Sequence, residues 1–316
     1  MSAFDHSLRV GFRDQLISAS KSGWWRDILE DKELIIALRG KYLNVYWKGQ
    51  SIFNVKFSSK ELKVSTHEKY LLDPKLSRQV LFDGKTFDTS ALEQKAFLRE
   101  YATGALERMK KAAEIYSGAE KKGCHWIALR KNNSVIDVEI ALPGTVEKGE
   151  AGEDVQSPRV DLLALEPLGN DKAQLVFWEA KDFENSELGS ARPSIEAPVL
   201  SQLAAYRSII EKHRSGIEAS YTRVCSDLCA IRGADDQRLN PIVREVAEGK
   251  RKVTLVEMPQ VNLVVFGLNE AERDSASWIK HKKTLEEALA KQCARLRAVG
   301  EPKKLILKRA SRTHRQ

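Results

Sequence analysis

Short apolar runs separated by glycine turns characterise the N-terminal part of the chain. Residues 33–57 carry β-branched and aromatic stretches that break at Arg39-Gly40-Lys41 and again at Lys48-Gly49-Gln50. Such runs are typical of strands in a hairpin or meander. We therefore predict a β-rich N-terminal domain over residues 1–90, after a short helical start. A nucleic-acid surface, a dimer or partner-protein surface, and a plain cover for the core all fit this segment.

A helical pattern comes next. Ser90-Ala91-Leu92-Glu93 fits a capping box, in which the serine and glutamate side chains satisfy each other's free backbone amides. An apolar stripe at helical spacing follows, formed by Phe97, Tyr101, Ala105 and Met109. These signals predict one long helix that ends near Ser117-Gly118, where glycine suits the C-terminal cap.

The remaining chain alternates between strand and helix patterns. Three strands are predicted at Val135–Leu142, Arg159–Leu165 and Gln174–Lys181. A helix opening at Pro198, a strand at Val261–Leu268 and a last helix from Ser277 to Gly300 follow. This order predicts an α/β fold with a mixed sheet flanked by helices. We assign residues 91–275 to this domain and residues 276–316 to a C-terminal helix and basic tail.

Composition places the chain among ordinary globular proteins, since 42% of its residues are hydrophobic and 30% are charged. Its longest apolar runs, such as Val261–Leu268, have the length of strands and are too short to span a membrane. The first twenty residues carry Asp5, Arg9, Arg13 and Asp14, so we see no signal-peptide core there. The expected location is cytoplasmic, without membrane partners.

Positive charge is concentrated at the C-terminal end. Residues 276–316 contain 12 Lys and Arg against 3 Asp and Glu, whereas residues 91–275 contain 25 against 30. A basic arm on an acidic core suits an enzyme of nucleic acid, because phosphate neutralisation releases counterions. A basic tail that only aids solubility is the plainer interpretation. The candidate phosphate contacts are Lys280, Lys282, Lys283, Lys303, Lys304, Lys308 and Arg309.

The strongest chemical signal lies where an apolar strand ends in charge. Side chains alternate along a strand, so Glu179 and Lys181 share one face while Ala180 points to the other. If the preceding strand pairs antiparallel with this one, Asp161 lies beside Glu179. Two converging carboxylates and a lysine suit Mg²⁺ or Mn²⁺ and a phosphate or water.

These residues resemble the PD-(D/E)XK, restriction-endonuclease-like nuclease superfamily. Asp161 is followed at hairpin distance by Glu179-Ala180-Lys181, and Gln202-Leu203-Ala204-Ala205-Tyr206 is similar to the Q-x-x-x-Y motif of its RecB-like and lambda-exonuclease-like branches. The resemblance covers residues 90–270 and implies a restriction-endonuclease-like core. It also implies a Mg²⁺-dependent phosphodiesterase that cuts nucleic acid, DNA rather than RNA, in a defence, restriction or repair setting. Val160 stands where the family often has proline.

Roles for individual residues follow from the resemblance. Asp161, Glu179 and the Ala180 carbonyl are expected to bind metal, and Lys181 to orient or help deprotonate a water. Glu139 is either a third ligand or solvated strand polarity, and Tyr206 is either a substrate contact with Gln202 or a core aromatic. Family members often draw a further acid from the preceding helix, where Glu100 or Glu107 would be the candidate, but we favour a solvated acidic stripe for these residues.

Position distinguishes this Glu-x-Lys group from others in the chain. Glu61-Leu62-Lys63 and Glu93-Gln94-Lys95 have the same spacing, but neither ends an apolar strand beside an acid. The rival interpretations are a nuclease-like module that binds nucleic acid or protein without cutting, and an interaction protein that works through residues 1–90. Whether cutting is internal or from an end cannot be read.

The four cysteines complete the candidate chemistry. Some RecB-like nucleases hold an iron–sulfur cluster with one cysteine before the core and three after it. The same order occurs here in Cys124, Cys225, Cys229 and Cys293, but the close C-x-x-C spacing is missing. We therefore expect buried free thiols rather than a cluster.

Overall fold

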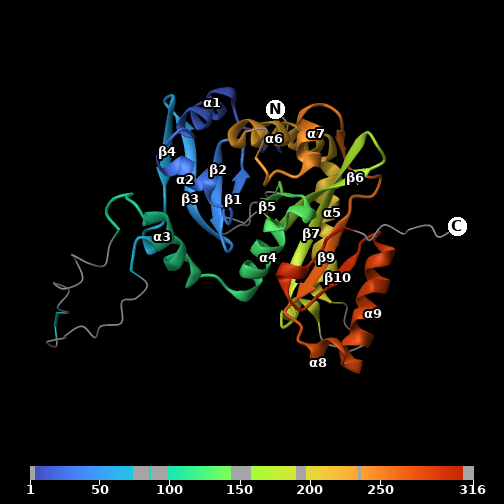
Figure 1. The fold of residues 1–316 in the computed structure, drawn as a ribbon. Helices are drawn as coiled ribbons and strands as arrows, with labels where there is room; N and C mark the ends of the chain where they lie inside the picture. The colour runs from blue at the N-terminus through green and yellow to red at the C-terminus, as the bar shows by residue number, and fades with distance from the viewer. Residues whose placement is uncertain are drawn as a thin grey trace, which may run out of the picture.

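The protein folds around two β-sheets that lie side by side (Figure 1). The computed structural model describes residues 4–73, 85–86, 98–143, 158–189, 197–233 and 236–308. The blue N-terminal part of the ribbon carries an antiparallel sheet, and the green-to-red part carries a mixed sheet. An α/β fold with a mixed sheet flanked by helices is thereby confirmed.

The antiparallel sheet confirms the predicted strands of the N-terminal part. Its order is β1-β2-β3-β4, with β1 at Ile35–Leu38, β2 at Tyr42–Trp47, β3 at Gln50–Ser58 and β4 at Glu61–Ser65. Lys48 and Gly49 join β2 to β3 with φ angles of 44° and 75°, and this left-handed pair matches the twist of a tight hairpin. Two helices precede the sheet, α1 at Val10–Ala19 and α2 at Trp24–Glu30.

The mixed sheet contains the three central strands in the predicted order. Its path is β10-β9-β7-β6-β5, and β8 also pairs with β7. The strands β5, β6 and β7 are antiparallel neighbours, whereas β9 runs parallel to β7. Their bounds are Val135–Ala141 for β5, Arg159–Leu168 for β6, Lys172–Asp182 for β7, Lys252–Thr254 for β8, Val261–Phe266 for β9 and Leu296–Ala298 for β10.

Helices pack on both faces of the mixed sheet. Leu203 and Tyr206 of α5 (Pro198–Lys212) join the apolar cluster that contains Phe177. On the other face, Ile127 of α4 (Ala119–Leu129) packs in the cluster of Trp178. The same helix lies between the two sheets in Figure 1. Alternation along β7 thus separates two layers, with Glu179 and Lys181 on the α5 side.

The single long helix predicted from residue 91 is wrong over its described part. Residues 98–104 are not helical, and α3 begins only at Ala105 and ends at Glu114. Gly104 adopts a left-handed φ of 82°, which stops helical hydrogen bonding on its N-terminal side. Gly118 then opens α4 instead of closing a helix. The capping box at Ser90 lies outside the described residues.

The C-terminal region also differs from the prediction. Helix α9 spans Ala276–Lys291, and its cap is Ser275, whose hydroxyl accepts from the Trp278 amide. The chain then forms β10, parallel to β9, so this region completes the mixed sheet. Residues 301–308 pack against the molecule rather than hanging free, since Leu307 is fully buried. The predicted strand and helix at Val261 and Pro198 are confirmed as β9 and α5.

Several helices had no counterpart in the sequence prediction. The longest is α6 at Arg214–Arg232, followed by α7 at Pro241–Ala247 and α8 at Glu270–Arg273. Short 3-10 turns occur at Glu68–Tyr70, Lys131–Asn133, Ser186–Leu188 and Pro302–Lys304, here called η1 to η4. In the described ranges, no helix combines the length and apolarity needed to cross a membrane.

Close packing of α4 on the sheet gives a first prediction. A Cβ atom on Gly123 would lie 2.2 Å from the Phe266 ring. Alanine adds about 1 kcal/mol of helix propensity, but overpacking of this kind costs about 1–3 kcal/mol. Because the 2.2 Å approach is far shorter than a normal contact, the upper part of that cost applies. After the gain in helix propensity, we expect Gly123→Ala to destabilise the protein by roughly 1–2 kcal/mol in urea denaturation.

The neighbouring Gly118 provides the control for this experiment. A Cβ there would meet nothing within 4 Å. Gly118→Ala is expected to cost less than about 1 kcal/mol, the usual penalty for alanine at a helix N-cap. Equal effects of the two substitutions would show that contact with Phe266 does not restrict Gly123.

Candidate active site

Pairing of β6 with β7 brings Asp161 and Glu179 together. Leu162 is the partner of Trp178 in the antiparallel register, so the next residues outward are Asp161 and Glu179. The backbone N–H of Ala180 donates to Asp161 Oδ2 at 2.8 Å. The sequence expectation for this pair of carboxylates therefore agrees with the geometry.

Lys181 lies against two carboxylates on the same face of β7. Its Nζ is 2.8 Å from Glu179 Oε1 and 2.5 Å from Glu187 Oε2. The Glu179 and Lys181 side chains are only 4% and 6% exposed. Sequence analysis did not find Glu187, which belongs to η3 after the end of β7. Asn185 caps this turn by accepting from the Glu187 amide, so a local Asn-x-Glu pattern was its only sequence signal.

Burial and charge shift the ionisation of all three predicted catalytic residues. Burial, followed by the Glu179 charge, raises the pKa of Asp161 well above its ordinary value. Burial raises the pKa of Glu179 to about 7 although Lys181 opposes the shift. Burial disfavours the charged form of Lys181, but the Glu179 and Glu187 carboxylates outweigh it and raise its pKa. Lys181 is therefore an ammonium at neutral pH.

The raised carboxyl pKa values predict how stability depends on pH. Glu179 shifts from 4.5 to about 7, so the folded chain holds a proton in that range that the unfolded chain has lost. By linkage, metal-free stability should fall as pH rises from about 4.5 to about 7, by on the order of 3 kcal/mol from this group. Asp161 shifts in the same direction. Urea midpoints at pH 5 and pH 8 test this expectation.

A divalent ion provides the control for the pH experiment. If Asp161 and Glu179 bind the ion, saturating Mg²⁺ should restore stability at pH 8 and change it little at pH 5. Stability that rises from pH 5 to pH 8 without metal would contradict the shifts assigned to these carboxyls.

The acid nearest the site from the preceding helices is Glu120, not Glu100 or Glu107. Glu120 belongs to the first turn of α4, and its Oε2 accepts from Asn185 Nδ2 at 2.7 Å. Its charge also contributes to the raised pKa of Glu179. Glu107 is instead paired with Lys110 at 3.0 Å, and Glu100 lies in the exposed segment before α3. The exposure of Glu100 and Glu107 agrees with the solvated stripe that we favoured for them. Glu120 was missed because residues 118–129 were not recognised as a separate helix.

Glu139 approaches the same group through an irregular part of β5. The pairing of β5 with β6 shifts register between Val135 and Asp137. Glu139 itself has a left-handed φ of 52°, a conformation that is uncommon for a residue with a side chain. Its charge helps raise the pKa of Asp161. Its only described ion pair is a long one, 3.9 Å to Arg159 Nη1.

The Gln202 and Tyr206 side chains meet on α5. Gln202 Nε2 donates to the Tyr206 hydroxyl at 2.8 Å. Burial, followed by the negative charge of Glu179, raises the pKa of Tyr206. Tyr206 is 5% exposed, so it is both packed in the core and close to the acids. Gln202 Oε1 is buried without a hydrogen-bond partner.

The predicted phosphate-contacting lysines come from other elements. Lys282 and Lys283 of α9 face Glu286 and Glu287 at 3.7 and 4.0 Å. Lys304 pairs with Glu301, and Lys303 Nζ lies 4.0 Å from the Trp126 ring centroid. Lys280 is exposed and Lys308 is half-buried. Arg309 lies outside the described residues.

The donor set suits a hard divalent cation. Glu179 Oε2 is buried and has no hydrogen-bond partner, and both site carboxyls carry raised pKa values in the absence of a cation. An ion such as Mg²⁺ accepts carboxylate oxygens and a backbone carbonyl such as that of Ala180. Within the described residues, no three His, Cys, Asp or Glu side chains form a ready-made ligand group. The residues that fit the ion are therefore the two carboxylates with the Ala180 carbonyl.

The cysteines are free. Cys225 is buried, Cys124 and Cys229 are half-buried, and Cys293 is exposed. Burial raises the pKa of the Cys124 thiol, with Asp161 as the next contributor. The expectation of buried thiols is therefore wrong for Cys293, which follows α9 at the surface.

Comparisons with known proteins do not assign the chain to a family. Neither a protein family model, nor a curated protein, nor a solved structure matches the chain.

Proposed function

We propose that the protein is a metal-dependent nuclease that hydrolyses phosphodiester bonds in nucleic acid. One observation carries the proposal: Asp161 and Glu179 are forced together beside Lys181 in a buried position. Such a carboxylate pair is costly without a compensating cation, and the Lys181 ammonium offsets it only in part, because both carboxyl pKa values stay raised. Perturbed groups of this kind are concentrated at functional sites.

The Asp161 and Glu179 carboxylates, with the Ala180 carbonyl, would hold Mg²⁺ or Mn²⁺. The ion supplies a Lewis acid and lowers the pKa of water. Glu120 on α4 and Glu139 on β5 add negative charge near the two carboxylates. Glu120 is already held by Asn185, so it fixes the segment after β7 against α4.

Lys181 is suited to stabilise charge rather than to accept a proton. Its ammonium is held by Glu179 and Glu187, and its pKa is raised. It would therefore orient a water or a phosphate oxygen and offset negative charge that develops at the phosphorus. Of the two roles expected from the resemblance, the pKa favours orientation over deprotonation.

The substrate assignment to DNA rests on the resemblance to PD-(D/E)XK nucleases. The Gln202–Tyr206 pair lies beside the acids and offers a buried amide oxygen and a phenol for orienting a substrate group. The net charge of +8 supports a polyanionic substrate.

Metal-dependent cutting tests the proposal directly. End-labelled single- and double-stranded DNA would be incubated with the full chain and Mg²⁺, Mn²⁺ or EDTA. We expect fragments with metal, none with EDTA, and none from Asp161→Ala. Product lengths would then distinguish internal cutting from digestion at an end.

The chain offers a matched control with the same tripeptide spacing. Glu61-Leu62-Lys63 lies on the edge strand β4, where both charged side chains are exposed. Glu61→Ala should leave cutting unchanged. If no metal supports cutting while DNA binding persists in EDTA, the protein is a binding module and the proposal is wrong.

A further inference from the structure

A cavity outside the candidate active site lies at the beginning of β5, where the chain leaves η2. It has a volume of about 290 Å³. Its walls are the end of α4, the strand β1, the start of β5, the last turn of α6 and residues 237–240 before α7. In Figure 1 the helices α6 and α7 lie above this part of the sheet. Ser134 and residues 135–137 of β5 line the cavity, whereas Glu139, further along the strand, approaches the candidate active site.

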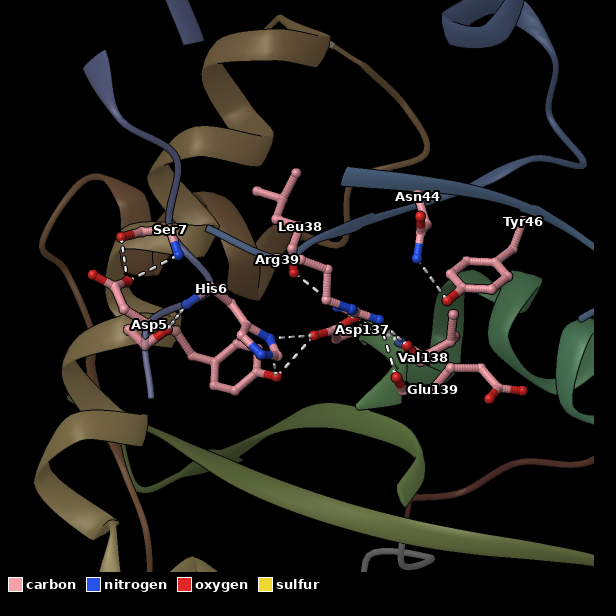
Figure 2. A network of polar contacts seen from close by, with 12 residues as sticks. Asp5, His6, Ser7, Leu38, Arg39, Asn44, Tyr46, Asp137, Val138 and Glu139 are labelled. Atoms are coloured by element: carbon pink, nitrogen blue, oxygen red, sulfur yellow. Dashed lines mark hydrogen bonds and ion pairs between the residues drawn. The ribbon is translucent and has the colours of Figure 1, made fainter. Parts of the chain in front are cut away.

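Among the residues that the structure describes, basic side chains outnumber acidic ones in the lining of the cavity. Its described lining includes the basic residues Lys32, Arg130, Lys131, Arg232 and Arg238. Asp137 is the one acid among those lining residues, and its carboxylate is already bound elsewhere. Arg39 Nη1 donates to Asp137 Oδ1 at 2.7 Å (Figure 2). The Tyr221 hydroxyl donates to Asp137 Oδ2 at 2.8 Å. Asp137 is therefore satisfied without the cations of the cavity.

Arg232 is the buried cation of this group. Its side chain is 9% exposed, and its Nη1 lies 3.5 Å from Asp236 Oδ2. The same Asp236 carboxylate accepts three hydrogen bonds from the Arg238 guanidinium, at 2.5 to 2.9 Å. Two guanidinium groups thus share one carboxylate, and the shorter contacts belong to Arg238.

This shortage of negative charge has a physical cost. Burial lowers the pKa of Arg232 to about 10, and the positive charge of Arg238 is the next largest cause. A buried cation without its own counter-charge destabilises a fold unless a ligand supplies that charge. Lys32 and Lys131 are exposed at the same cavity, and within the described residues neither makes an ion pair.

We propose that this cavity binds a phosphate monoester carried by a small apolar body, such as a mononucleotide. Arginine guanidinium groups bind phosphate through paired, charge-assisted hydrogen bonds. Apolar side chains form the rest of the wall, among them Leu34, Ile36, Leu239 and Val243. A small cavity with an apolar wall and convergent cations suits a phosphorylated small molecule better than a bare inorganic ion. The proposal does not depend on the nuclease function.

Calorimetric titration of the full chain tests the site. The probes are AMP, adenosine and inorganic phosphate, in buffer that contains EDTA and no other phosphate. We expect AMP to bind at least about tenfold more tightly than adenosine, because a hydrogen bond to a charged group is worth about 1.5–3 kcal/mol. Inorganic phosphate should bind more weakly than AMP, since it leaves the apolar wall uncovered.

Three substitutions locate the site and one serves as control. Arg232→Gln, Arg238→Ala and Lys131→Ala should each weaken AMP binding by about tenfold or more. Lys63→Ala removes an exposed lysine on β4 and should leave binding unchanged. If Arg232→Gln fails to fold by circular dichroism, Arg238 and Lys131 decide the matter, because both side chains are more exposed.

Two results would overturn the proposal. One is the absence of AMP binding to the wild-type chain at millimolar concentration. The other is AMP binding that the three cavity substitutions leave unchanged, or that Lys63→Ala weakens equally. Because EDTA is present throughout, neither result depends on whether the protein cuts DNA.

Discussion

Replacing Glu179 with glutamine is expected to abolish function and to stabilise the metal-free fold. Loss of one ligand and of its charge should lower metal-dependent cutting by at least about 100-fold. The same substitution removes a buried carboxylate whose pKa is raised to about 7. Glutamine keeps the shape of the neutral acid, so the metal-free variant should be more stable at pH 8, by roughly 1–2 kcal/mol.

These two effects separate a catalytic role from a structural one. A residue that only supports the fold would lose activity together with stability. Cutting of labelled DNA and urea midpoints at pH 8, both with and without Mg²⁺, should instead move in opposite directions. Glu61→Gln, in the exposed Glu61-Leu62-Lys63 tripeptide, should change neither quantity. A Glu179→Gln protein that is less stable without metal would contradict this expectation. It would show that the ion pair between Lys181 and Glu179 stabilises the fold by more than burial of the carboxylate destabilises it.

Asp137→Ala is expected to produce the largest loss of stability, about 3–5 kcal/mol. The Arg39 side chain is 4% exposed and its carboxylate partner is 2% exposed. Removing Asp137 would leave the guanidinium buried without a counter-charge. It would also remove the acceptor of the Tyr221 hydroxyl. The 3.2 Å contact of His6 Nδ1 with Asp137 Oδ2 would be lost as well (Figure 2).

This network joins segments that are far apart in the sequence. Arg39 follows β1, Asp137 belongs to β5 and Tyr221 to α6. Arg39 also donates to the carbonyl oxygens of Val138 and Glu139, so it holds the part of β5 that presents Glu139. We therefore expect the N-terminal sheet and the mixed sheet to unfold together.

Urea denaturation followed by circular dichroism measures the effect of Asp137→Ala. Asp5→Ala is the matched control, because Asp5 is 43% exposed in its ion pair with Arg223 and should cost less than about 1 kcal/mol. The double variant Arg39→Met, Asp137→Leu should be more stable than Asp137→Ala, since it removes both charges. A single-variant cost below about 1 kcal/mol would mean that water reaches Arg39.

Local sequence pattern determined the strands and the central pair of acids. Alternation and glycine turns specify β1, β2 and β3 because side-chain burial in a hairpin depends on near neighbours. The pairing of Asp161 with Glu179 follows from the same rule, since a short turn sets the register of β6 and β7. The Gln202 and Tyr206 positions on one face of α5 are likewise a matter of helical spacing.

Tertiary structure decided which distant residues complete the site. Glu187 contacts Lys181 because η3 follows the end of β7, and Glu120 brings its charge near Glu179 because α4 packs against β7. The sequence pattern of the individual elements does not show either arrangement. The start of α3 at Ala105 was also not predictable from an apolar stripe, because the left-handed Gly104 overrides helix propensity.

The charge balance of the cavity beside Arg232 has the same origin. Arg232 and Arg238 are close in sequence, but their shared dependence on Asp236 appears only when the end of α6 and residues 236–240 pack near β1 and β5. Likewise β10 joins the mixed sheet through parallel pairing with β9, a contact between segments separated by α9. Periodicity reports which face of an element is buried, whereas the partner of that face is set by packing across the whole chain.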